Sequence, residues 1–471
     1  MTKKLKILFV SSEVVPYAKT GGLADVAGAL PLALNTLGVD VRIALPKYRG
    51  ITVEANEDSL GGKVPVYFIE NSNYYDREYL YSTPEGDYLD NLERFVFFSQ
   101  EVLKRTKKEN FKPDIIHCND WQTALIPVYL KTIYSNDEFF KNTKIIFTIH
   151  NLAYQGLFEQ KEWSKIGLPK ELCNIDGLEY YGKINLMKGG LIFSDFITTV
   201  SPNYIKEIQT EEYGFGMEGI LNSRTDVLKG IINGIDYEIW NPDKDSKIPQ
   251  NYNIKTLDKK TTNKQHLQTE TNMSIGRDIP LIGAIGRLTD QKGWDLIAEV
   301  IDEICQKDLQ MIILGTGEKK YHKLMDKIAA KYPLKTSINL KFDATLAQKI
   351  YAASDMFLMP SKFEPCGLGQ LISYRYGSVP VARATGGLKD TITDLTEDPV
   401  HGTGFLFQEY TSQELLKTIE RALESYKNRR IWRNLQKRII KANYSWQYSA
   451  KEYLKLYHNV TKTLQNPVNV R

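Results

Sequence analysis

The chain has 471 residues, of which 42% are hydrophobic and 25% are charged, and its formal net charge is +4. This length predicts two or three domains, because single hydrophobic cores stop growing at about 250–300 residues. The small positive charge does not favour a nucleic-acid partner, although it suits an anionic small substrate. No uninterrupted apolar stretch of the sequence is long enough to span a membrane.

The first elements alternate between strand and helix. Residues 5–10 are apolar and predict a strand, a glycine turn contains Lys19, Gly21 and Gly22, and residues 24–37 have a helical pattern that Gly38 ends. A further strand over residues 39–45 completes a βαβ unit, which implies a parallel sheet. The apolar start runs directly into Glu13 without a small-residue cleavage pattern, so it predicts a strand rather than a secretion signal.

Several further strands are expected in this half, and some end in polar residues. Apolar runs predict strands at residues 64–69, 95–98, 114–119, 144–149, 196–200 and 231–236. Asp120 follows one of them, and His150 and Asn151 follow another. Ligands of parallel sheets bind outside the carboxyl ends of the strands, so these polar residues are candidates for a site.

A polar stretch separates the two halves. Residues 244–278 are rich in Lys, Asn, Gln and Thr and predict a linker that carries one polar helix. Strands are then expected at residues 280–285, 310–314, 356–360 and 402–407, with a helix within 342–355 and a largely helical end from residue 412. We therefore expect two α/β sandwiches in series, with the ligand site in the cleft that separates them.

The stretch from Ser361 to Leu388 combines an acid with two glycine turns. It follows a predicted buried strand and contains Glu364, Cys366 and Gly367 before a helix-like segment, and Thr385, Gly386 and Gly387 close it. A strand that passes through glycines into a helix presents backbone N–H groups, which favour an anion. An acid in the same turn could hold a neutral polyol beside that anion, so the pattern suggests a phosphate-linked sugar.

Other residues are weighed against simpler roles. Lys19 before its glycines could face a phosphate or could be a solvated lysine, and Asp25 could be a helix-dipole acid. Arg287 and Lys292 flank a turn after a predicted strand, where they could neutralise a leaving diphosphate or simply be solvated. His150 at a strand end is a candidate for a hydrogen bond to substrate, or a satisfied core histidine.

Metal and nicotinamide chemistry are not favoured. Asp243 and Asp245 match a D-x-D pattern but follow no strand, and Lys320 stands where the dinucleotide fingerprint that begins at Gly315 needs its third glycine. The sequence therefore predicts no metal and no cofactor. The cysteines at positions 118, 173, 305 and 366 form no C-x-x-C pair, which predicts reduced thiols and a cytoplasmic protein.

Seven motifs in order resemble those of the bacterial glycogen synthases, a family shared with plant starch synthases. They are KTGGLADV (19–26), HCNDWQTAL (117–125), TIHNLAYQG (148–156), INGID (232–236), GRLTDQKGWDL (286–296), FEPCGLGQL (363–371) and ATGGL (384–388). The resemblance implies a GT-B fold, in which two Rossmann-like domains face each other across a deep cleft. It places an acceptor-side domain at 1–243, a donor domain at 244–445, and a C-terminal helix at 446–471 that packs back on the first domain.

The resemblance also implies an activity. It implies transfer of glucose from ADP-glucose to the non-reducing-end 4-hydroxyl of an α-1,4-glucan such as glycogen, with retention of configuration, without a metal, and without nucleic-acid or membrane partners. Two alternatives on the same fold are an inactive glucan-binding protein and a glucan phosphorylase with a lysine-bound pyridoxal phosphate. Turnover of ADP-glucose would separate the first alternative, and a cofactor absorbance scan the second.

The implied site residues follow the motifs. The residues implied to act in catalysis are Asp25, His150, Arg287, Lys292 and Glu364. The residues implied to bind substrate are Lys19, Gly21, Gly22, Asp120, Asn151, Asn233, Phe342, Cys366, Gly367, Leu368, Thr385, Gly386 and Gly387. The sequence departs from many related transferases at Ile372, where a second Glu would contact the ribose, and at Phe342, where bacterial relatives stack a Tyr on adenine.

Overall fold

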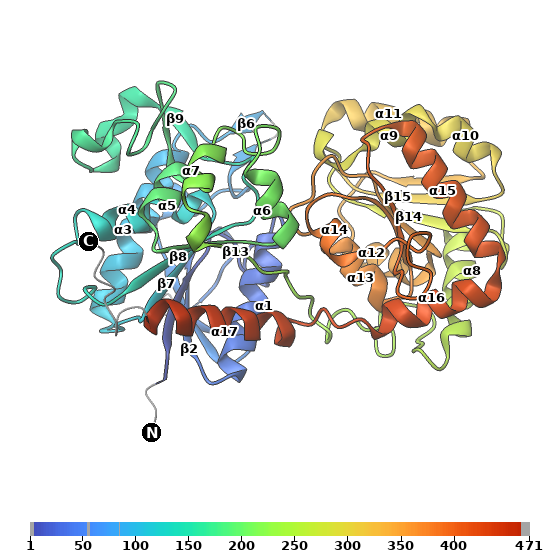
Figure 1. The fold of residues 1–471 in the computed structure, drawn as a ribbon, viewed down its shortest axis with the longest axis horizontal. Helices are drawn as coiled ribbons and strands as arrows, with labels where there is room; N and C mark the ends of the chain where they lie inside the picture. The colour runs from blue at the N-terminus through green and yellow to red at the C-terminus, as the bar shows by residue number, and fades with distance from the viewer. Residues whose placement is uncertain (1–3, 54–56, 84, 463–471) are drawn as a thin grey trace. The chain divides into compact units, whose positions relative to one another are not determined.

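The computed structural model describes residues 4–53, 57–83 and 85–462, which form two compact α/β units (Figure 1). Unit 1 contains the described residues up to Gly234 together with those from Trp446 onward, and unit 2 contains Ile235–Ser445. The structure therefore divides the chain after Gly234, whereas the sequence placed the boundary after Asp243.

Unit 1 is built on an eight-stranded sheet in the order β13-β12-β8-β7-β1-β2-β4-β3. All neighbouring strands pair in parallel except β3 with β4, so seven carboxyl ends share one edge. The strands are β1 (Lys6–Val10), β2 (Asp40–Pro46), β3 (Glu57–Leu60), β4 (Val64–Ile69), β7 (Ile115–Asn119), β8 (Lys144–Ile149), β12 (Phe196–Thr199) and β13 (Leu228–Gly230). Small strands outside this sheet are β5 (Ser82–Thr83), β6 (Gly86–Asp87), β9 (Leu157–Glu159), β10 (Glu179–Tyr180) and β11 (Lys183–Asn185).

The helices of unit 1 include one that the sequence assigned to a strand. They are α1 (Gly22–Thr36), α2 (Ser72–Tyr75), α3 (Asn91–Lys108), α4 (Leu125–Lys131), α5 (Leu186–Phe193), α6 (Pro202–Ile208), α7 (Glu218–Ser223) and α17 (Trp446–Lys462). The predicted strand at residues 95–98 is wrong, because this segment lies inside α3. Leu92, Phe95, Val96 and Ser99 are buried at helical spacing, a period that the four-residue apolar run alone conceals.

The strand predicted at residues 231–236 is displaced. The last strand of unit 1 is β13 (Leu228–Gly230), which pairs with β12. The next residue, Ile231, donates one further backbone hydrogen bond to the Thr199 carbonyl oxygen, and the chain then leaves the sheet. Beyond it, Ile235 belongs to unit 2, where it forms a bridge with Ser445. Ile231 and Ile235 are therefore buried although this segment forms no strand of its own.

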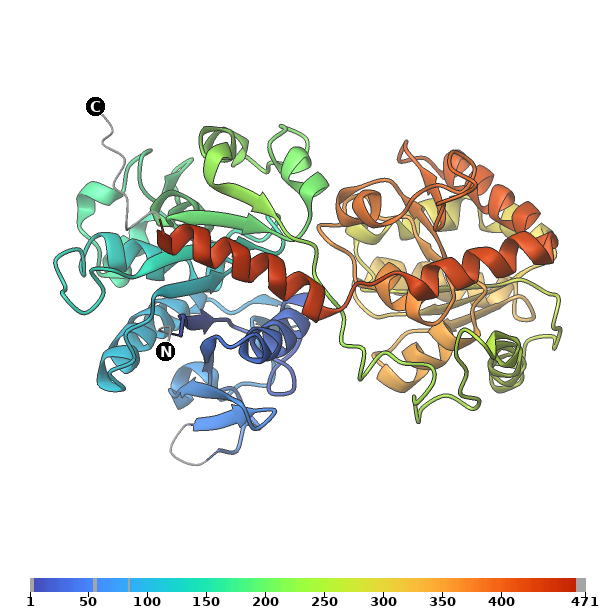
Figure 2. The ribbon, with the colours of Figure 1, turned by 60° about the horizontal axis from the view of Figure 1, so that its bottom comes forward.

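Helix α17 returns the end of the described chain to unit 1. It packs against α1 (Figures 1 and 2), and its Ser449 donates a hydrogen bond to the Ile232 carbonyl oxygen over 2.7 Å. Its Tyr457 hydroxyl lies 2.7 Å from Nδ1 of His117, a buried residue of β7 whose Nε2 contacts the Thr148 hydroxyl on β8. A polar network thus joins the last helix to the middle of the sheet.

Unit 2 contains a wholly parallel sheet in the order β16-β15-β14-β17-β18-β19. Its strands are β14 (Leu281–Ile285), β15 (Gln310–Leu314), β16 (Thr336–Asn339), β17 (Met356–Met359), β18 (Val379–Arg383) and β19 (Phe405–Phe407). Strands β14, β15, β17 and β18 are short and almost completely buried, as expected for a sheet covered on both faces, whereas the edge strand β16 is mostly half-buried. The strands that the sequence predicted here, at residues 280–285, 310–314, 356–360 and 402–407, are confirmed in position.

Helices cover both faces of this sheet, with α9, α10 and α11 on one side and α8, α12 and α13 on the other (Figure 1). The helices are α8 (Lys260–Glu270), α9 (Trp294–Glu299), α10 (Ile301–Gln306), α11 (Lys319–Lys331), α12 (Ala344–Ala353), α13 (Gly369–Arg375), α14 (Gly386–Thr391), α15 (Ser412–Lys427) and α16 (Arg429–Lys441). The helix predicted within 342–355 and the helical C-terminal region are confirmed over the described residues.

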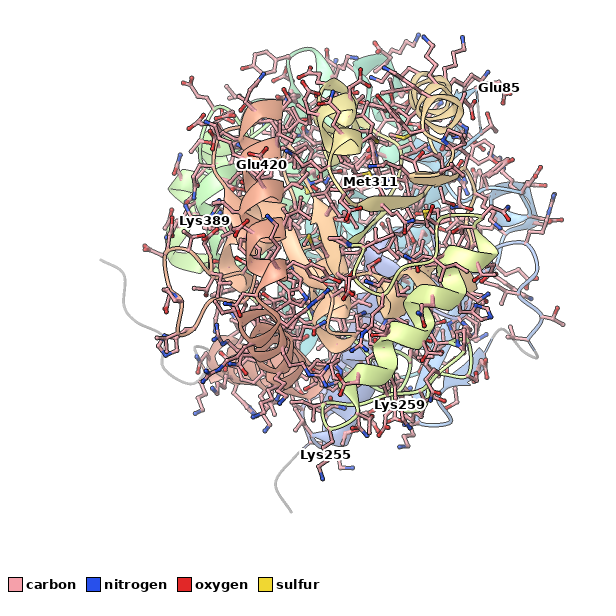
Figure 3. All side chains as sticks on the ribbon, turned by 90° about the vertical axis from the view of Figure 1, so that its right-hand side faces the viewer. Glu85, Lys255, Lys259, Met311, Lys389 and Glu420 are labelled. Atoms are coloured by element: carbon pink, nitrogen blue, oxygen red, sulfur yellow. The ribbon has the colours of Figure 1, made fainter. Side chains whose placement is uncertain are left out.

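The polar segment 244–278 does carry one helix, as predicted, but α8 is packed rather than exposed. It lies against α12 and buries Lys260, Asn263, Lys264 and Gln268 along one face, with Leu267 as its one buried apolar residue. Lys255 and Lys259, just before this helix, are exposed and point outward in Figure 3. The interpretation as a linker is wrong because long polar side chains form this buried face.

The two Rossmann-like α/β units predicted from the sequence are confirmed. Each unit has its own large hydrophobic core around its sheet. Over the described ranges, no helix combines the length and apolar character needed to cross a membrane.

Candidate active site

The candidate residues of unit 1 gather at the carboxyl edge of its sheet. Strands β1, β7 and β8 are adjacent and parallel, and they are followed by Glu13, Asp120 and His150. The chain must turn sharply at this edge, and Asp120 has a positive φ of 54°, which is uncommon for a non-glycine residue. The topology thus brings together three side chains that are separated widely in the sequence.

Glu13 anchors the glycine turn that contains Lys19. Its buried carboxylate accepts hydrogen bonds from the Gly21 backbone N–H over 3.0 Å and from the Thr20 hydroxyl over 2.6 Å. The Tyr81 hydroxyl donates to the same carboxylate over 2.9 Å. The sequence did not assign Glu13 a role, although its position directly after a strand offered the same signal that singled out Asp120.

Lys19 and Asp25 lie beside each other on this turn. The Lys19 Nζ is 2.7 Å from Asp25 Oδ1, and the two side chains are 43% and 34% exposed. Burial of its carboxyl raises the pKa of Asp25, and the Lys19 ammonium opposes that shift. The pair presents a cation at the start of α1, with Gly21 and Gly22 adjacent in sequence.

Asp120 and His150 form a tightly hydrogen-bonded pair of strand ends. Asp120 Oδ1 accepts the His150 backbone N–H over 2.7 Å, and His150 Nε2 lies 2.9 Å from Asn119 Oδ1. Asn119 donates its own N–H to the Val10 carbonyl, which fixes the amide orientation and makes His150 Nε2 the donor. His150 Nδ1 is then the acceptor of the neutral ring.

Burial governs the charges of this pair. Desolvation lowers the pKa of His150 to about 3, so the imidazole is neutral at physiological pH. Desolvation raises the pKa of Asp120 to about 7, although backbone N–H groups of His150 and Asn151 favour its charged form. This edge of unit 1 therefore offers hydrogen bonds rather than a fixed positive charge, apart from Lys19.

Two asparagines complete the predicted set in unit 1. Asn151 Oδ1 accepts the Ala153 N–H over 3.1 Å and so shapes the loop after β8. Asn233 is 5% exposed, and its Oδ1 has no hydrogen-bond partner among the described residues. A buried amide oxygen without a partner is costly, which makes Asn233 a candidate to accept a donor from a ligand.

In unit 2 the structure places Lys292 in direct contact with Glu364. Lys292 Nζ is 2.9 Å from Oε1 and 2.7 Å from Oε2 of Glu364, and the Ser361 hydroxyl donates to Oε2 over 2.8 Å. The two side chains are 21% and 8% exposed. Their strands, β14 and β17, are neighbours in the sheet, so residues far apart in the sequence meet at its carboxyl edge.

Backbone contacts hold two turns together at Glu364. The Gly387 N–H donates to the Glu364 carbonyl over 3.0 Å, and Gly386 has a φ of 45°. A Cβ at Gly386 would lie 1.9 Å from the Glu364 oxygen, and one at Gly387 would lie 2.1 Å from the Cys366 oxygen. Only glycine allows this approach, which explains the G-G pair that the sequence singled out.

The remaining predicted residues of unit 2 lie on the same sheet edge. Arg287 follows β14, Cys366 is buried, and Leu368 is half-buried beside Gly367. Phe342 follows β16 and is 81% exposed. Thr385 is buried at the start of the turn that contains Gly386.

The structure shows the environment of Ile372, where many related transferases have a second Glu. Ile372 is 6% exposed inside the hydrophobic core of unit 2, so this side chain is not available for a polar contact to a ribose.

Among the residues that the structure describes, no group of three or more His, Cys, Asp or Glu side chains is arranged to hold a metal ion.

Comparisons with known proteins match this arrangement. Residues 6–223 match the family described as starch synthase catalytic domain, and residues 272–446 match glycosyl transferases group 1. A glycogen synthase from Thermosipho melanesiensis is 47% identical over 479 residues, covering 96% of this chain and 98% of the relative. The chain belongs to the glycogen synthase family. Glycogen synthase 2 of Geobacter sulfurreducens is also 47% identical, over 98% of this chain and 99% of its own length.

Solved structures agree with the assignment to the glycogen synthase family, whose members are glycosyltransferases. The catalytic domain of starch synthase IV from Arabidopsis thaliana, solved with ADP and acarbose, superposes with a TM-score of 0.90 at 34% identity, covering 98% of this chain and 100% of that chain. A sucrose-phosphate synthase from Thermosynechococcus elongatus has a TM-score of 0.64 at 16% identity, over 97% of this chain and 99% of that one, and shares the fold.

Proposed function

We propose that this member of the glycogen synthase family transfers glucose from ADP-glucose to the non-reducing-end 4-hydroxyl of an α-1,4-glucan, with retention of configuration and without a metal. The observation that carries the proposal is the contact of Lys292 with Glu364 at the carboxyl edge of unit 2. It pairs a cation for a diphosphate with a carboxylate for sugar hydroxyls. The ADP-bound starch synthase, 34% identical, supports the choice of nucleotide.

Unit 2 is assigned to the donor. Arg287 and Lys292 bind the diphosphate, and Glu364 binds the glucose hydroxyls, with Cys366, Gly367, Leu368 and the turn Thr385–Gly387 around the sugar. Phe342 stacks on the adenine, for which its 81% exposure leaves a free ring face. Fixed cations stabilise the negative charge that develops as the leaving group departs.

Unit 1 is assigned to the acceptor and to the reacting face of the glucose. Lys19 with Gly21 and Gly22 approaches the donor phosphate, and Asp25, Asp120, Asn151 and Asn233 contact hydroxyls. His150 accepts a hydrogen bond from the glucose 6-hydroxyl at Nδ1, since Nε2 is engaged with Asn119. The cytoplasmic location expected from the sequence belongs to the same proposal.

The proposed reaction occurs on one face of the glucose ring. The bond between the anomeric carbon and the diphosphate oxygen breaks, and the 4-oxygen of the glucan forms a bond to the same carbon. The proton of that hydroxyl passes to the leaving phosphate oxygen, so ADP is the second product. No carboxylate base is needed, in contrast to the paired acids of a retaining hydrolase.

Donor competition tests the proposal. The purified full chain is incubated with glycogen and an equimolar mixture of ADP-glucose and UDP-glucose, each with a different isotope in the glucose. We expect transfer chiefly from ADP-glucose, into chains that an α-1,4-specific amylase releases. Absence of transfer from either nucleotide sugar would support an inactive glucan-binding protein, and phosphorolysis of glycogen would support a phosphorylase.

A further inference from the structure

A charged cavity lies in unit 2, away from the proposed donor site. It has a volume of about 460 Å³, and Lys260, Lys264, Arg277, Asp355, Arg429 and Arg433 contribute to its wall. Asp355 directly precedes β17, whereas Glu364 follows that strand, so the cavity opens at the amino-terminal edge of the sheet. The proposed function uses none of these residues.

The wall of this cavity has more positive than negative side chains. Five Lys or Arg residues line it against three carboxylates, those of Asp258, Asp278 and Asp355. Each carboxylate is already paired, Asp355 with Lys264 over 2.8 Å, Asp258 with Arg433 over 3.0 Å, and Asp278 with Arg429. Two cations are left without a carboxylate, which gives the cavity a net positive charge.

Lys260 is the first of these two cations. It is 5% exposed, and its Nζ donates to the carbonyl oxygens of Tyr351 and Ala352 over 3.0 and 2.8 Å and lies 3.2 Å from the Ser378 hydroxyl. Desolvation lowers the pKa of Lys260 to about 7. A buried ammonium compensated only by neutral oxygens gains most from an added anion.

Arg277 is the second. It lies in the loop before β14, its side chain is exposed, and it forms no ion pair with any described residue. Its guanidinium therefore remains available to a ligand, and its loss disturbs no contact seen in the structure. A guanidinium matches the geometry of phosphate oxygens through two parallel N–H donors.

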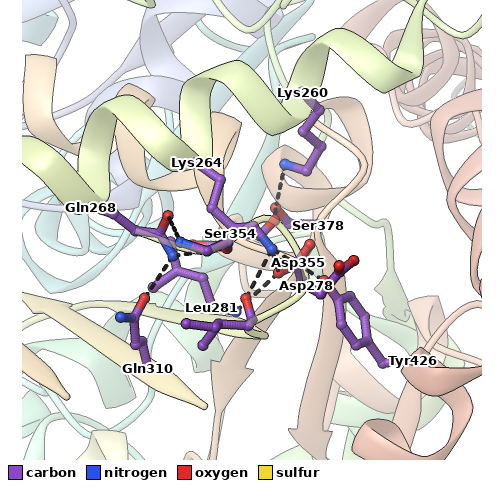
Figure 4. Close-up of polar contacts among 12 residues, drawn as sticks. Lys260, Lys264, Gln268, Asp278, Leu281, Gln310, Ser354, Asp355, Ser378 and Tyr426 are labelled. Atoms are coloured by element: carbon purple, nitrogen blue, oxygen red, sulfur yellow. Dashed lines mark hydrogen bonds and ion pairs between the residues drawn. The ribbon is translucent and has the colours of Figure 1, made fainter. Parts of the chain in front are cut away.

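Two helices hold the other cations in place. Lys264 on α8 is fixed by Asp355, by the Ile279 carbonyl and by the Tyr426 hydroxyl, as Figure 4 shows for Asp355 and Tyr426. Arg429 and Arg433 come from α16, a helix with six Lys or Arg residues and no acid. The positive charge is thus built on rigid elements, and the polar face of α8 has a structural reason to be buried.

We propose that this cavity binds a small phosphate-bearing anion, of the size of pyrophosphate or a sugar phosphate, at a site separate from the donor site. Its volume is within the range of small-molecule pockets, about 300–1,000 Å³. Arg277 and Arg433 contact the phosphate oxygens, and Lys260, whose three N–H groups are already donated within the protein, contributes its positive charge from the wall. The inference is independent of the proposed transferase activity.

Calorimetric titration of the full-length Lys292→Ala variant with inorganic pyrophosphate tests this site, because that change weakens diphosphate binding at the donor site. We expect pyrophosphate still to bind to this variant, in the cavity lined by Arg277 and Arg433. Adding Arg277→Ala and Arg433→Ala should weaken it at least about tenfold, since two charge-assisted contacts are lost. Arg430→Ala is the matched control, an exposed arginine of α16 outside the cavity, and should leave affinity within about twofold.

A single-residue variant and a second anion complete the test. Arg277→Ala alone, at an exposed position, should weaken binding about threefold or more and covers the case in which the combined variant fails to fold. A titration with glucose 1-phosphate identifies the source of the phosphate, because tighter binding than pyrophosphate assigns the site to a sugar phosphate. Failure of both anions to bind the Lys292→Ala variant, or affinities that the Arg277 and Arg433 changes leave unaltered, would overturn the proposal.

Discussion

The carboxyl edges of the two sheets differ in the charge of their central side chains. In unit 1 the central pair is Asp120 and His150, both half-buried, with a histidine whose pKa is lowered to about 3 by desolvation. In unit 2 the central pair is Lys292 and Glu364, an ion pair that also contacts Ser361. The same parallel topology therefore places a neutral histidine with a hydrogen-bonded carboxyl at the centre of one edge and an ion pair at the centre of the other.

This difference matches the two demands of glycosyl transfer. A departing diphosphate needs fixed positive charge, whereas sugar hydroxyls need oriented donors and acceptors without a strong field. In the proposed function, the first demand is met mainly by Arg287 and Lys292 of unit 2, with help from Lys19 of unit 1. The second is met mainly by His150 and Asn233 of unit 1, with help from Glu364 of unit 2. Three predictions test this division, beginning with the largest expected effect, and a fourth tests the buried contact of His117 with α17.

Lys292→Ala should lower kcat/KM for ADP-glucose about 100- to 1,000-fold, because in the proposed function it removes a cation that stabilises the leaving diphosphate. Steady-state turnover with glycogen measures the effect, and thermal unfolding checks that the fold survives. Lys362→Ala is the matched control, since Lys362 is exposed and its hydrogen bonds are made by its backbone, from its N–H to Gln291 and from Arg383 to its carbonyl oxygen. Equal activity of the Lys292 variant and the parent would show that Lys292 does not stabilise the leaving diphosphate.

His150→Ala should lower kcat/KM roughly tenfold, the cost of one hydrogen bond to substrate. Because the pKa of His150 is about 3, its ring is neutral from about pH 6 to 8, and the ratio of parent to variant activity should be constant there. pH profiles of both proteins measure that ratio, with the exposed His401→Ala as control. An inflection of the ratio between pH 6 and 7 would show that the imidazole titrates.

Phe342→Ala should raise the KM for ADP-glucose about fivefold, the effect of losing about 1 kcal/mol of base stacking at an exposed ring. Phe342→Tyr retains the ring and should behave like the parent. Leu334→Ala, another exposed apolar position of unit 2 at 65% exposure, controls for a general surface effect. A KM that responds equally to both changes at Phe342 would argue against stacking.

His117→Asn should make the stability of the protein less sensitive to acid. Burial lowers the pKa of His117 from 6.5 to about 3, so below pH 6.5 the unfolded chain binds a proton that the native state does not. The free energy of unfolding therefore falls with decreasing pH, by at most about 1.4 kcal/mol per pH unit for this group. Urea denaturation of parent and variant at pH 7 and pH 5 measures the two slopes.

The comparison of slopes isolates His117 from other buried groups. Asp120, with a pKa raised to about 7, acts in the opposite sense, because the native state binds more protons than the unfolded chain from pH 3.8 to about 7. That contribution is shared by parent and variant, so it cancels in the difference. His458→Asn changes an exposed histidine of α17 and controls for the substitution itself. Identical slopes for parent and the His117 variant would contradict the assignment.

Local patterns predicted most strands, because a buried strand needs only four to six apolar residues in a row. They failed at residues 95–98, where the same apolar run belongs to the amphipathic helix α3. They also failed at α8, which has a polar composition typical of an exposed linker helix, although its Lys260 and Lys264 are buried. In both cases the neighbouring elements, rather than the local sequence, decide which side of the segment is buried.

The sequence by itself determined the family, the alternation of strands and helices, and the residue types at the strand ends, since each depends on short motifs and local periodicity. Only the tertiary structure decided which of these residues meet. Lys292 contacts Glu364 because β14 and β17 are neighbours, and His117 meets Tyr457 because α17 returns to unit 1. Such contacts depend on strand order and chain return, which local sequence patterns do not encode.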